Sequence, residues 1–399
     1  MTRDIDIKGF CESRFDIVRE AFINNFKQFE EIGVSFAVTL NGKPTIDLWA
    51  GHTDIAKSTS WERDTIITVF SITKIMTSIC VLMLADKNLL ELDAPVSKYW
   101  PEFGTNGKKA ITIRQVLSHT AGIPSWEESF PQEDLVDWRK MVKLLERQKP
   151  WWEPGTKAGY HAVTFGFILG EIVRRITGKT LGTYFQENVA QPLNADFHIG
   201  ISNEYENRMV DIIPPEAPFI GDTLDHESIL YRILGIPGGW NLGGKITKEF
   251  VKFCNTPSFR KAEIPASNGS SNARAVARIA SAISCGGEVD NIKILSQNML
   301  DEALKEQFYG PDFLFIDGIR YGTGFGLPSK WKPIQNPNTL YWGGWGGSVC
   351  IMDLDANLSI AYVMNKMRIQ DPEETLKNKY ASDSRANLLV SSVYKALNQ

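Results

Sequence analysis

The chain has 399 residues, of which 43% are hydrophobic and 23% are charged, and its formal net charge is −4. A chain of this length can bury a large core, and its ordinary composition argues against a disordered, collagen-like or coiled-coil protein. The near-neutral charge gives no sign of a nucleic-acid partner or of an anionic membrane surface. Length alone predicts two to three domains or one large composite unit.

The first residues of the sequence and the spacing of its cysteines indicate the cellular compartment of the protein. The first residues lack the basic stretch and the apolar stretch of a secretory signal, and no run approaches the length of a membrane helix. Five cysteines lie far apart without a CxxC pair. We interpret them as small buried hydrophobic residues in a reducing compartment. These features predict a cytoplasmic protein with no membrane association.

The N-terminal region combines a helical pattern with a hairpin. Residues 8–30 have apolar side chains at amphipathic helical spacing, which predicts a helix. Two β-prone runs, 33–40 and 45–50, flank Asn41-Gly42. Because Asn-Gly suits the tight turn of a hairpin, these runs predict two antiparallel strands.

The middle and the end of the chain differ in pattern. From Ser71 to about residue 280, helical segments alternate with loops rich in Pro and Gly, and we predict helices at 75–85, 135–147, 164–177 and 273–283. Near the end, 339–342 is a β-prone run too short to predict a strand alone, whereas 349–353 and 358–364 predict two strands, and a last helix is expected at 385–397.

This order predicts an α/β protein of the α+β type, with one antiparallel sheet built from both ends of the chain and flanked by helices. We expect a sheet domain of residues 1–70 and 285–399, a mostly helical domain of residues 71–284, and an active site in the cleft between them.

Several common signatures of enzymes are missing. There is no Gly-x-Ser-x-Gly and no HExxH, and the five histidines show no metal-ligand spacing. The segment 239–246 nearly matches a phosphate-binding loop but ends in Ile246, where a hydroxyl would have to meet magnesium. The sequence therefore predicts no metal site and no cofactor.

One motif stands out by its context. Ser71-Ile72-Thr73-Lys74 is an S-x-x-K, a spacing that also begins at Ser258, Ser329 and Ser392. Only Ser71 follows a strand-like run, 65–70, and opens an apolar helix. Residues at i and i+3 share one helix face, so Ser71 and Lys74 are expected to lie together.

The apolar helix that follows this pair suggests a chemical role for Ser71 and Lys74. Burial would lower the pKa of Lys74, and a neutral amine can activate a serine hydroxyl. The N-terminus of the helix would favour negative charge that develops nearby. The alternative is a capping serine followed by a lysine that extends to solvent.

Further motifs follow in a fixed order along the chain. They are the segments 89–101 and 111–124, Pro154-Gly155 before Tyr160-His161-Ala162, and Trp342-Gly343-Gly344-Trp345-Gly346-Gly347-Ser348. Taken together, from about residue 30 to about residue 365, the chain resembles the serine β-lactamase-like esterases. These are the family VIII carboxylesterases, which are related to class C β-lactamases and D,D-peptidases. The resemblance implies a β-lactamase-like fold.

The resemblance also implies roles for matching residues. Ser71 would be the acylated nucleophile and Lys74 its helical partner. Tyr160 would act as general base and then return the proton to the leaving alcohol, with Lys74 lowering the pKa of Tyr160. The oxyanion hole would consist of the backbone N–H groups of Ser71 and Trp345.

Other residues are candidates for binding the substrate, namely Trp342, Gly343 and Gly344 of the third motif, together with His161, Trp152 and Trp240. Each has a structural alternative: an aromatic residue in the core, or a Gly-rich turn. Both His119 and His161 fit a structural role better than a catalytic one. Tyr205-Glu206-Asn207 competes as second motif, but it lacks the preceding Pro-Gly.

Two departures from β-lactamases indicate the substrate. The second motif is Tyr-His-Ala instead of Tyr-x-Asn, and Trp342 replaces the lysine of Lys-Thr-Gly. A neutral apolar group there suits uncharged esters, so we predict a carboxylesterase for short-chain esters. The alternatives are an acyltransferase, an amidase or β-lactamase-type activity, or a non-catalytic binding protein. The expected partner is a small ester, and the expected state is a monomer or a homodimer.

Overall fold

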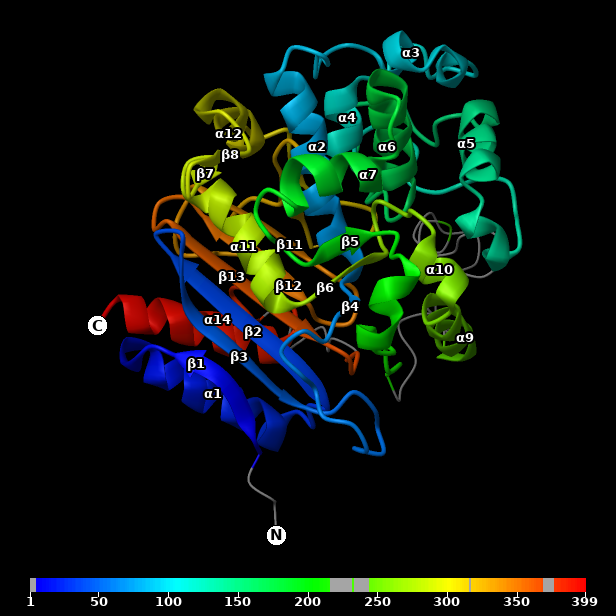
Figure 1. The fold of residues 1–399 in the computed structure, drawn as a ribbon. Helices are drawn as coiled ribbons and strands as arrows, with labels where there is room; N and C mark the ends of the chain where they lie inside the picture. Colours follow the sequence, from blue (N-terminus) through cyan, green and yellow to red (C-terminus); the bar gives the residue numbers. More distant parts are fainter. Residues whose placement is uncertain (1–4, 216–231, 233–243, 316, 369–376) are drawn as a thin grey trace.

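A six-stranded antiparallel sheet forms the centre of the computed structural model, which describes residues 5–215, 232, 244–315, 317–368 and 377–399 (Figure 1). Its strand order is β1-β3-β2-β13-β12-β11. The strands are β1 (Ile7–Cys11), β2 (Gly33–Leu40), β3 (Lys43–Gly51), β11 (Thr339–Gly343), β12 (Val349–Asp353) and β13 (Leu358–Met364). The predicted sheet from both ends of the chain is therefore confirmed.

The sheet joins the two ends of the chain at its centre. β2 pairs with β13, and Phe36 lies opposite Tyr362 in this register. The turn between β2 and β3 contains Asn41 and Gly42 at φ angles of 51° and 75°. Two positive φ angles are what the predicted Asn-Gly hairpin turn requires.

The N-terminal helix is shorter than the sequence predicts. Residues 7–11 form β1, a 3₁₀ turn covers Ser13–Phe15, and α1 spans only Asp16–Gln28. The first part of the predicted helix is wrong because β1 pairs with β3 along its whole length. Gly9 allows this pairing, since a Cβ at that position would lie 1.9 Å from the carbonyl oxygen of Asp47.

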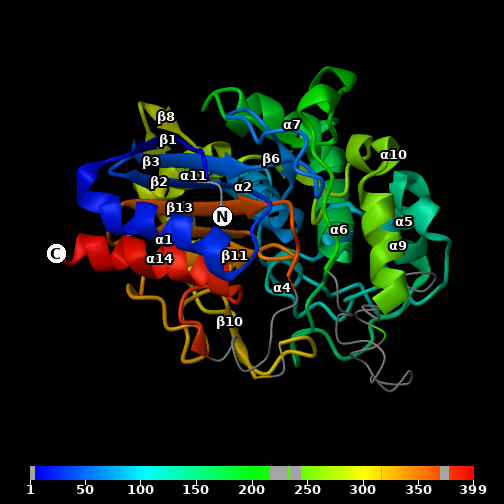
Figure 2. The same ribbon diagram turned by 90° about the horizontal axis from the view of Figure 1, so that it is seen from below.

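Helices cover both faces of the sheet. α1 and α14 (Ser384–Leu397) lie side by side on one face, and α11 (Ala273–Ser284) lies on the other (Figure 2). Along β12, Ile351 joins the core beneath α1 and α14, whereas its neighbour Cys350 joins the core on the side of α11. This alternation follows from the pleat of a strand. α11 thus packs on the sheet, although the predicted division assigns it to the helical domain, and that division stays a prediction.

The helical part surrounds α2 (Thr73–Asp86), which is buried from Thr73 to Leu84. Its neighbours include α6 (Thr164–Thr177), α7 (Leu181–Phe185) and α12 (Gln297–Leu304). The other helices are α3 (Val96–Tyr99), α4 (Ile113–Leu117), α5 (Trp138–Arg147), α9 (Gly244–Cys254) and α10 (Pro257–Lys261). The short strands are β4 (Ile67–Thr68), β5 (Phe197–Ile199), β6 (Gly269–Ser271), β7 (Glu288–Val289), β8 (Ile292–Lys293), β9 (Phe308–Gly310) and β10 (Ile319–Tyr321).

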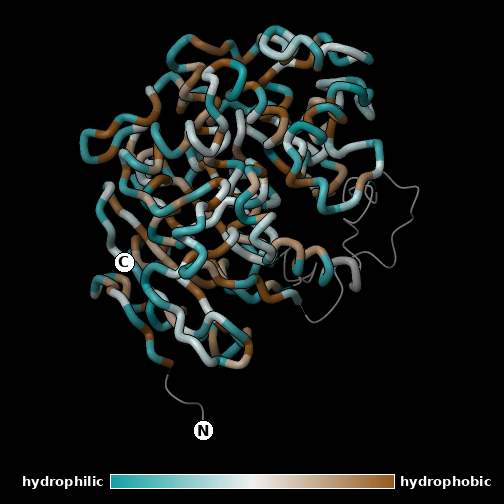
Figure 3. Tube along the Cα trace, turned by 45° about the vertical axis from the view of Figure 1, so that its right-hand side comes forward, coloured by the Kyte–Doolittle hydropathy of each residue, from teal (hydrophilic) through white to brown (hydrophobic). Residues whose placement is uncertain are grey.

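Hydropathy along the trace fits amphipathic elements that share a core. Figure 3 shows apolar and polar segments interleaved throughout both parts of the molecule. Among the residues that the structure describes, no helix has both the length and the apolar character needed to cross a membrane.

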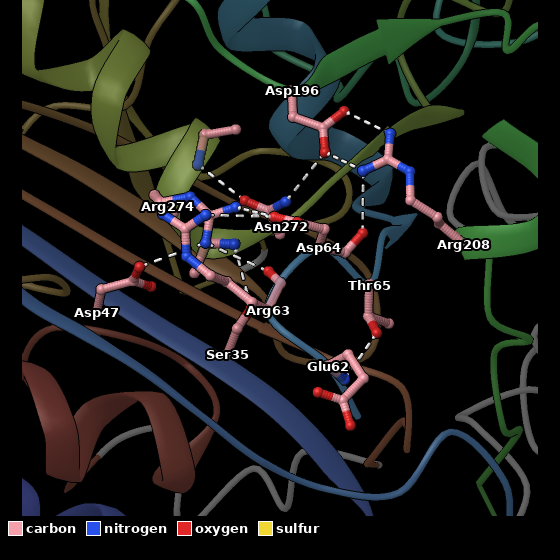
Figure 4. Close-up of polar contacts among 12 residues, drawn as sticks. Ser35, Asp47, Glu62, Arg63, Asp64, Thr65, Asp196, Arg208, Asn272 and Arg274 are labelled. Atoms are coloured by element: carbon pink, nitrogen blue, oxygen red, sulfur yellow. Dashed lines mark hydrogen bonds and ion pairs between the residues drawn. The ribbon is translucent and has the colours of Figure 1, made fainter. Parts of the chain in front are cut away.

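A polar network holds the N-terminal end of α11 against the sheet (Figure 4). Arg274 donates to Asp47 of β3 at 3.3 Å and to Asp64 at 2.6 Å. Asn272, the N-cap of α11, contacts Asp196, which also binds Arg208. The strand β6 directly before Asn272 pairs with β4, and β4 leads into Ser71. The network therefore helps to fix the segment that carries the candidate nucleophile.

Candidate active site

Ser71 lies in a strained turn between β4 and α2. The 3₁₀ helix η2 covers Phe70–Ile72, and α2 begins at Thr73. Phe70 is buried and has a φ of 47°, in the left-handed region that bulky residues rarely adopt. The turn places Ser71 just before the helix instead of within it.

Lys74 lies in the interior, one turn after Ser71. Its Nζ is 3.3 Å from Ser71 Oγ, and it donates to the carbonyl oxygens of Ala162 at 2.6 Å and Ala266 at 3.0 Å. The residue is only 2% exposed, so the alternative of a lysine that extends to solvent is wrong. Burial holds the pKa of Lys74 well below its ordinary value, which favours the neutral amine.

The side chain of Tyr160 also reaches Ser71. Its hydroxyl donates to Ser71 Oγ at 2.8 Å, and the indole Nε1 of Trp342 donates to Tyr160 Oη at 3.3 Å. Lys74 Nζ lies 4.7 Å from the centre of the Tyr160 ring. The competing Tyr205 packs elsewhere, with its ring 4.0 Å from that of His198.

The protonation of Tyr160 differs from the expectation. Burial raises the pKa of Tyr160, and the hydrogen bonds with Ser71 and Trp342 offset only part of this effect. The prediction that Lys74 lowers this pKa is therefore wrong. The physical reason is that burial disfavours the charged form of Lys74, which would have stabilised a tyrosinate.

Two buried histidines support the second motif through its backbone. The carbonyl of His119 accepts from the N–H of Gly159, and His119 Nδ1 accepts from the N–H of His161, both at 3.1 Å. His161 Nε2 accepts from the N–H of Ile123 at 3.1 Å, so Nδ1 donates to the carbonyl of Gly159 at 2.6 Å. Burial lowers the pKa of His161 to about 3. Since its ring is fully buried and both nitrogens bind backbone, the prediction that His161 binds substrate does not fit its surroundings.

Asp312 is a site residue that the sequence analysis missed. Its buried carboxylate accepts from the backbone N–H groups of Tyr160 at 3.3 Å, Leu314 at 2.7 Å and Phe315 at 3.2 Å. Tyr321 Oη donates to its second oxygen at 3.1 Å. Burial raises the pKa of Asp312. The available signal was an acidic residue within the aromatic stretch 308–315.

The candidate substrate-binding residues fall into different environments. Trp342 is almost buried, and its ring packs 5.6 Å from that of Tyr160. Phe315, which the sequence analysis also missed, is 37% exposed and lies 5.5 Å from the Tyr160 ring. Trp152 packs on Phe313 at 5.1 Å and is part of the support of the second motif. Trp240 lies outside the described residues.

The glycine loop, defined here as residues 343–348, runs beside the turn that carries Ser71. A Cβ at Gly344 would lie 2.4 Å from the carbonyl oxygen of Val69, and Ser348 Oγ donates to the same oxygen at 3.3 Å. The ring of Trp345 contacts Phe70 at 5.2 Å. Trp345 and Ser71, the residues expected to form the oxyanion hole, therefore lie on adjacent segments.

Within the described part of the chain, no group of three or more His, Cys, Asp or Glu side chains is arranged so that it could hold a metal ion.

Comparisons with known proteins agree on one family. The family model described as Beta-lactamase matches residues 22–381. A protein of Mycobacterium tuberculosis named esterase/beta-lactamase LipL is 33% identical over 365 residues, which cover 90% of this chain and 83% of that protein.

Solved structures are similar over nearly the whole chain. The crystal structure of a family VIII carboxylesterase is 35% identical with a TM-score of 0.87, covering 98% of this chain and 100% of that one. A penicillin-binding protein homologue from Caulobacter crescentus is 30% identical with a TM-score of 0.86 and the same coverage. The similarity thus includes the sheet, the helical part and the segments that carry Ser71, Tyr160 and Trp342.

Proposed function

The chain belongs to the beta-lactamase family, and we propose from this membership and from the geometry around Ser71 that it is a carboxylesterase that works through an acyl-enzyme on Ser71. The observation that carries the proposal is the buried Lys74 amine, 3.3 Å from Ser71 Oγ and without its ordinary tendency to hold a proton. A serine beside a neutral amine is an activated nucleophile.

The hydrogen bonds of Lys74 support its role as the base. A neutral amine has two N–H bonds and one lone pair, and the two carbonyl oxygens of Ala162 and Ala266 occupy the N–H bonds. The lone pair is then directed toward Ser71 Oγ. In this arrangement the serine hydroxyl donates to the amine, which is the geometry needed for proton transfer.

Acylation follows from these positions. Lys74 takes the proton of Ser71 while Oγ bonds to the ester carbonyl carbon, and the electron pair of the C=O bond moves to the oxygen. The backbone N–H groups of Ser71 and Trp345 stabilise this oxyanion. When the intermediate collapses, the C–O bond to the alcohol breaks, and the protonated Tyr160 gives its proton to the leaving oxygen.

Deacylation restores both proton carriers. The tyrosinate of Tyr160, stabilised by the indole N–H of Trp342, takes a proton from water, and the hydroxide attacks the acyl carbon. The bond to Ser71 breaks, and Lys74 returns its proton to Oγ. Over one cycle an ester and a water molecule become an acid and an alcohol, and each residue regains its starting state.

The surroundings favour uncharged esters. Trp342 and Phe315 present aromatic surface next to Tyr160, the group that meets the leaving alcohol. We therefore propose short-chain carboxylic esters as substrates. Hydrolysis of β-lactams is the second candidate, because the similar LipL is named both esterase and beta-lactamase.

The test compares two serines with the same S-x-x-K spacing. With p-nitrophenyl butyrate, Ser71→Ala should lower kcat by about 10⁴-fold or more, since removal of a nucleophile leaves only binding and oxyanion stabilisation. Ser258→Ala, the matched control, should keep the wild-type rate and the stoichiometric burst of p-nitrophenol. Unchanged turnover in Ser71→Ala contradicts the proposal. A parallel assay with a chromogenic cephalosporin decides the second candidate.

A further inference from the structure

A fully buried charge cluster lies behind the glycine loop. Arg385, at the start of α14, donates to Glu31 at 2.8 Å and to Asp383 at 2.9 Å, and its side chain is 0% exposed. Tyr362 Oη donates to the second oxygen of Glu31 at 2.7 Å. Removing one partner from a buried ion pair is strongly destabilising, so the groups of this cluster are expected to stay together.

One of the groups that Arg385 binds belongs to the glycine loop. Arg385 Nη2 donates to the carbonyl oxygen of Gly346 at 3.0 Å. The next residue packs directly on the cluster: a Cβ at Gly347 would lie 2.4 Å from Asp383 Oδ2 and 2.8 Å from Arg385 Nη2. Both glycines have positive φ angles, 92° and 130°, which let the backbone follow this surface.

The other side of the same loop faces the nucleophile. Gly344 packs against the Val69 carbonyl, and the Trp345 ring packs against Phe70, the residue before Ser71. Trp345 therefore lies between two fixed points, the Ser71 turn on one side and the Gly346 carbonyl on the other. The backbone N–H of Arg368 donates to the same Gly346 carbonyl at 3.2 Å, and Gly344 and Ser348 share a backbone hydrogen bond within the loop, so loss of the Arg385 contact should shift the loop without releasing it.

We propose that Arg385 is a positioning residue for ester hydrolysis, which holds the Gly346 carbonyl and thereby orients the backbone N–H of Trp345 toward the oxyanion. This inference rests on the proposed function, because the Trp345 N–H matters only if a tetrahedral oxygen forms on the Ser71 side. Arg385 touches no substrate. Its effect should fall on the transition state and leave substrate binding unchanged.

The experiment measures the oxyanion hole directly. Arg385→Lys keeps the positive charge but loses the forked geometry that reaches both the carboxylates and Gly346. Its kcat for p-nitrophenyl butyrate, per site titrated by the burst, should fall about 10-fold or more with KM unchanged, since loss of a whole donor costs about 10²–10³. Inhibition by phenylboronic acid, which forms a tetrahedral adduct on the serine, should weaken by a similar factor.

A matched control and a second variant accompany it. Arg260→Lys makes the same change in another buried arginine, which pairs with Asp211 instead of the loop, and should alter neither quantity. Asp383→Asn keeps an N-cap for α14 but removes the oxygen bound to Arg385 Nη2. Asp383→Asn should show the same loss in kcat and in boronate affinity. If Arg385→Lys does not fold, this variant still tests the positioning role of Arg385.

The outcomes separate the two proposals. A folded Arg385→Lys or Asp383→Asn enzyme with kcat and boronate affinity within about 2-fold of wild type overturns the positioning role. So does a loss that follows only the number of titratable sites, since that would reflect stability alone. If the wild-type enzyme hydrolyses esters and Ser71→Ala does not, the proposed function stands whichever result these variants give.

Discussion

Burial shifts the pKa values of both groups that flank Ser71. It lowers the pKa of Lys74 and raises that of Tyr160, so the amine is free to accept a proton while the phenol keeps one to give. In the proposed mechanism these two groups, with pKa values shifted in opposite senses toward their neutral forms, are the base and the acid around one nucleophile.

The dependence of kcat/KM on pH should reflect the ionisation of Lys74. Because acylation needs the neutral amine, kcat/KM should be constant at high pH and should fall as pH drops through the lowered pKa of Lys74. Tyr160 keeps its proton above its ordinary pKa of about 10, so no alkaline decline is expected below that value. The measurement is kcat/KM for p-nitrophenyl butyrate between about pH 5 and pH 10. Lys74→Arg, which remains charged throughout, should be inactive over the whole range; activity with an unchanged profile would remove Lys74 from the role of base.

Tyr160 should matter most for poor leaving groups. Tyr160→Phe removes the proton that the departing alcohol receives, but p-nitrophenolate leaves without one. In the acylation step we therefore expect a loss of about 10²–10⁴-fold for an ethyl ester and a much smaller loss for the p-nitrophenyl ester with the same acyl group. Single-turnover rates with the two esters check this, and equal losses would contradict the role as acid.

At the scale of elements, two neighbouring glycines of β11 and the glycine loop differ sharply in the space around them. A Cβ at Gly344 would lie 2.2 Å from Ser348 Oγ and 2.4 Å from the Val69 carbonyl, whereas a Cβ at Gly343 would meet only Ser348 O, at 3.5 Å. Gly344→Ala should therefore push the loop away from the Ser71 turn and lower Tm by several degrees, as overpacking costs about 1–3 kcal/mol. Gly343→Ala should leave Tm nearly unchanged. Thermal unfolding followed by circular dichroism compares the Tm values of the two variants. Equal values would contradict the prediction, because they would show that the loop accommodates the added methyl group without loss of stability.

The same scale shows what the sequence could predict. The strands 349–353 and 358–364 and the helix 164–177 match the structure because strong apolar periodicity and clear turn residues bound them. The prediction of a helix over residues 7–11 is wrong because the strand character of this segment comes from pairing with β3 and not from its own sequence pattern. The strand-like run 65–70 reduces to two paired residues, since the chain turns at Phe70.

At the scale of the whole molecule, long-range contacts separate what was predictable from what was not. The grouping of Ser71, Lys74 and Tyr160 was implied by the family resemblance that motifs in a fixed order carry. By contrast, Asp312 meets the Tyr160 backbone across 152 positions, and Arg385 meets Glu31 across 354. Local sequence patterns do not predict such a contact, because in the sequence each partner is an ordinary charged residue. Only the fold brings the two residues together. The sheet order likewise needed the pairing of β2 with β13, which only the structure provides.

The pairing of β2 with β13 affects how the protein folds during its synthesis. During translation, Ser71, Lys74 and Tyr160 leave the ribosome well before β11, β12 and β13. At a synthesis rate of about 5–20 residues per second, β13 emerges on the order of tens of seconds after the hairpin of β2 and β3 with which it pairs. Until residue 364 has emerged, the nascent chain holds Ser71, the proposed nucleophile, without the sheet that positions the glycine loop beside it. Under the proposed mechanism, hydrolysis therefore starts only after β11, β12 and β13 have emerged and β13 has paired with β2.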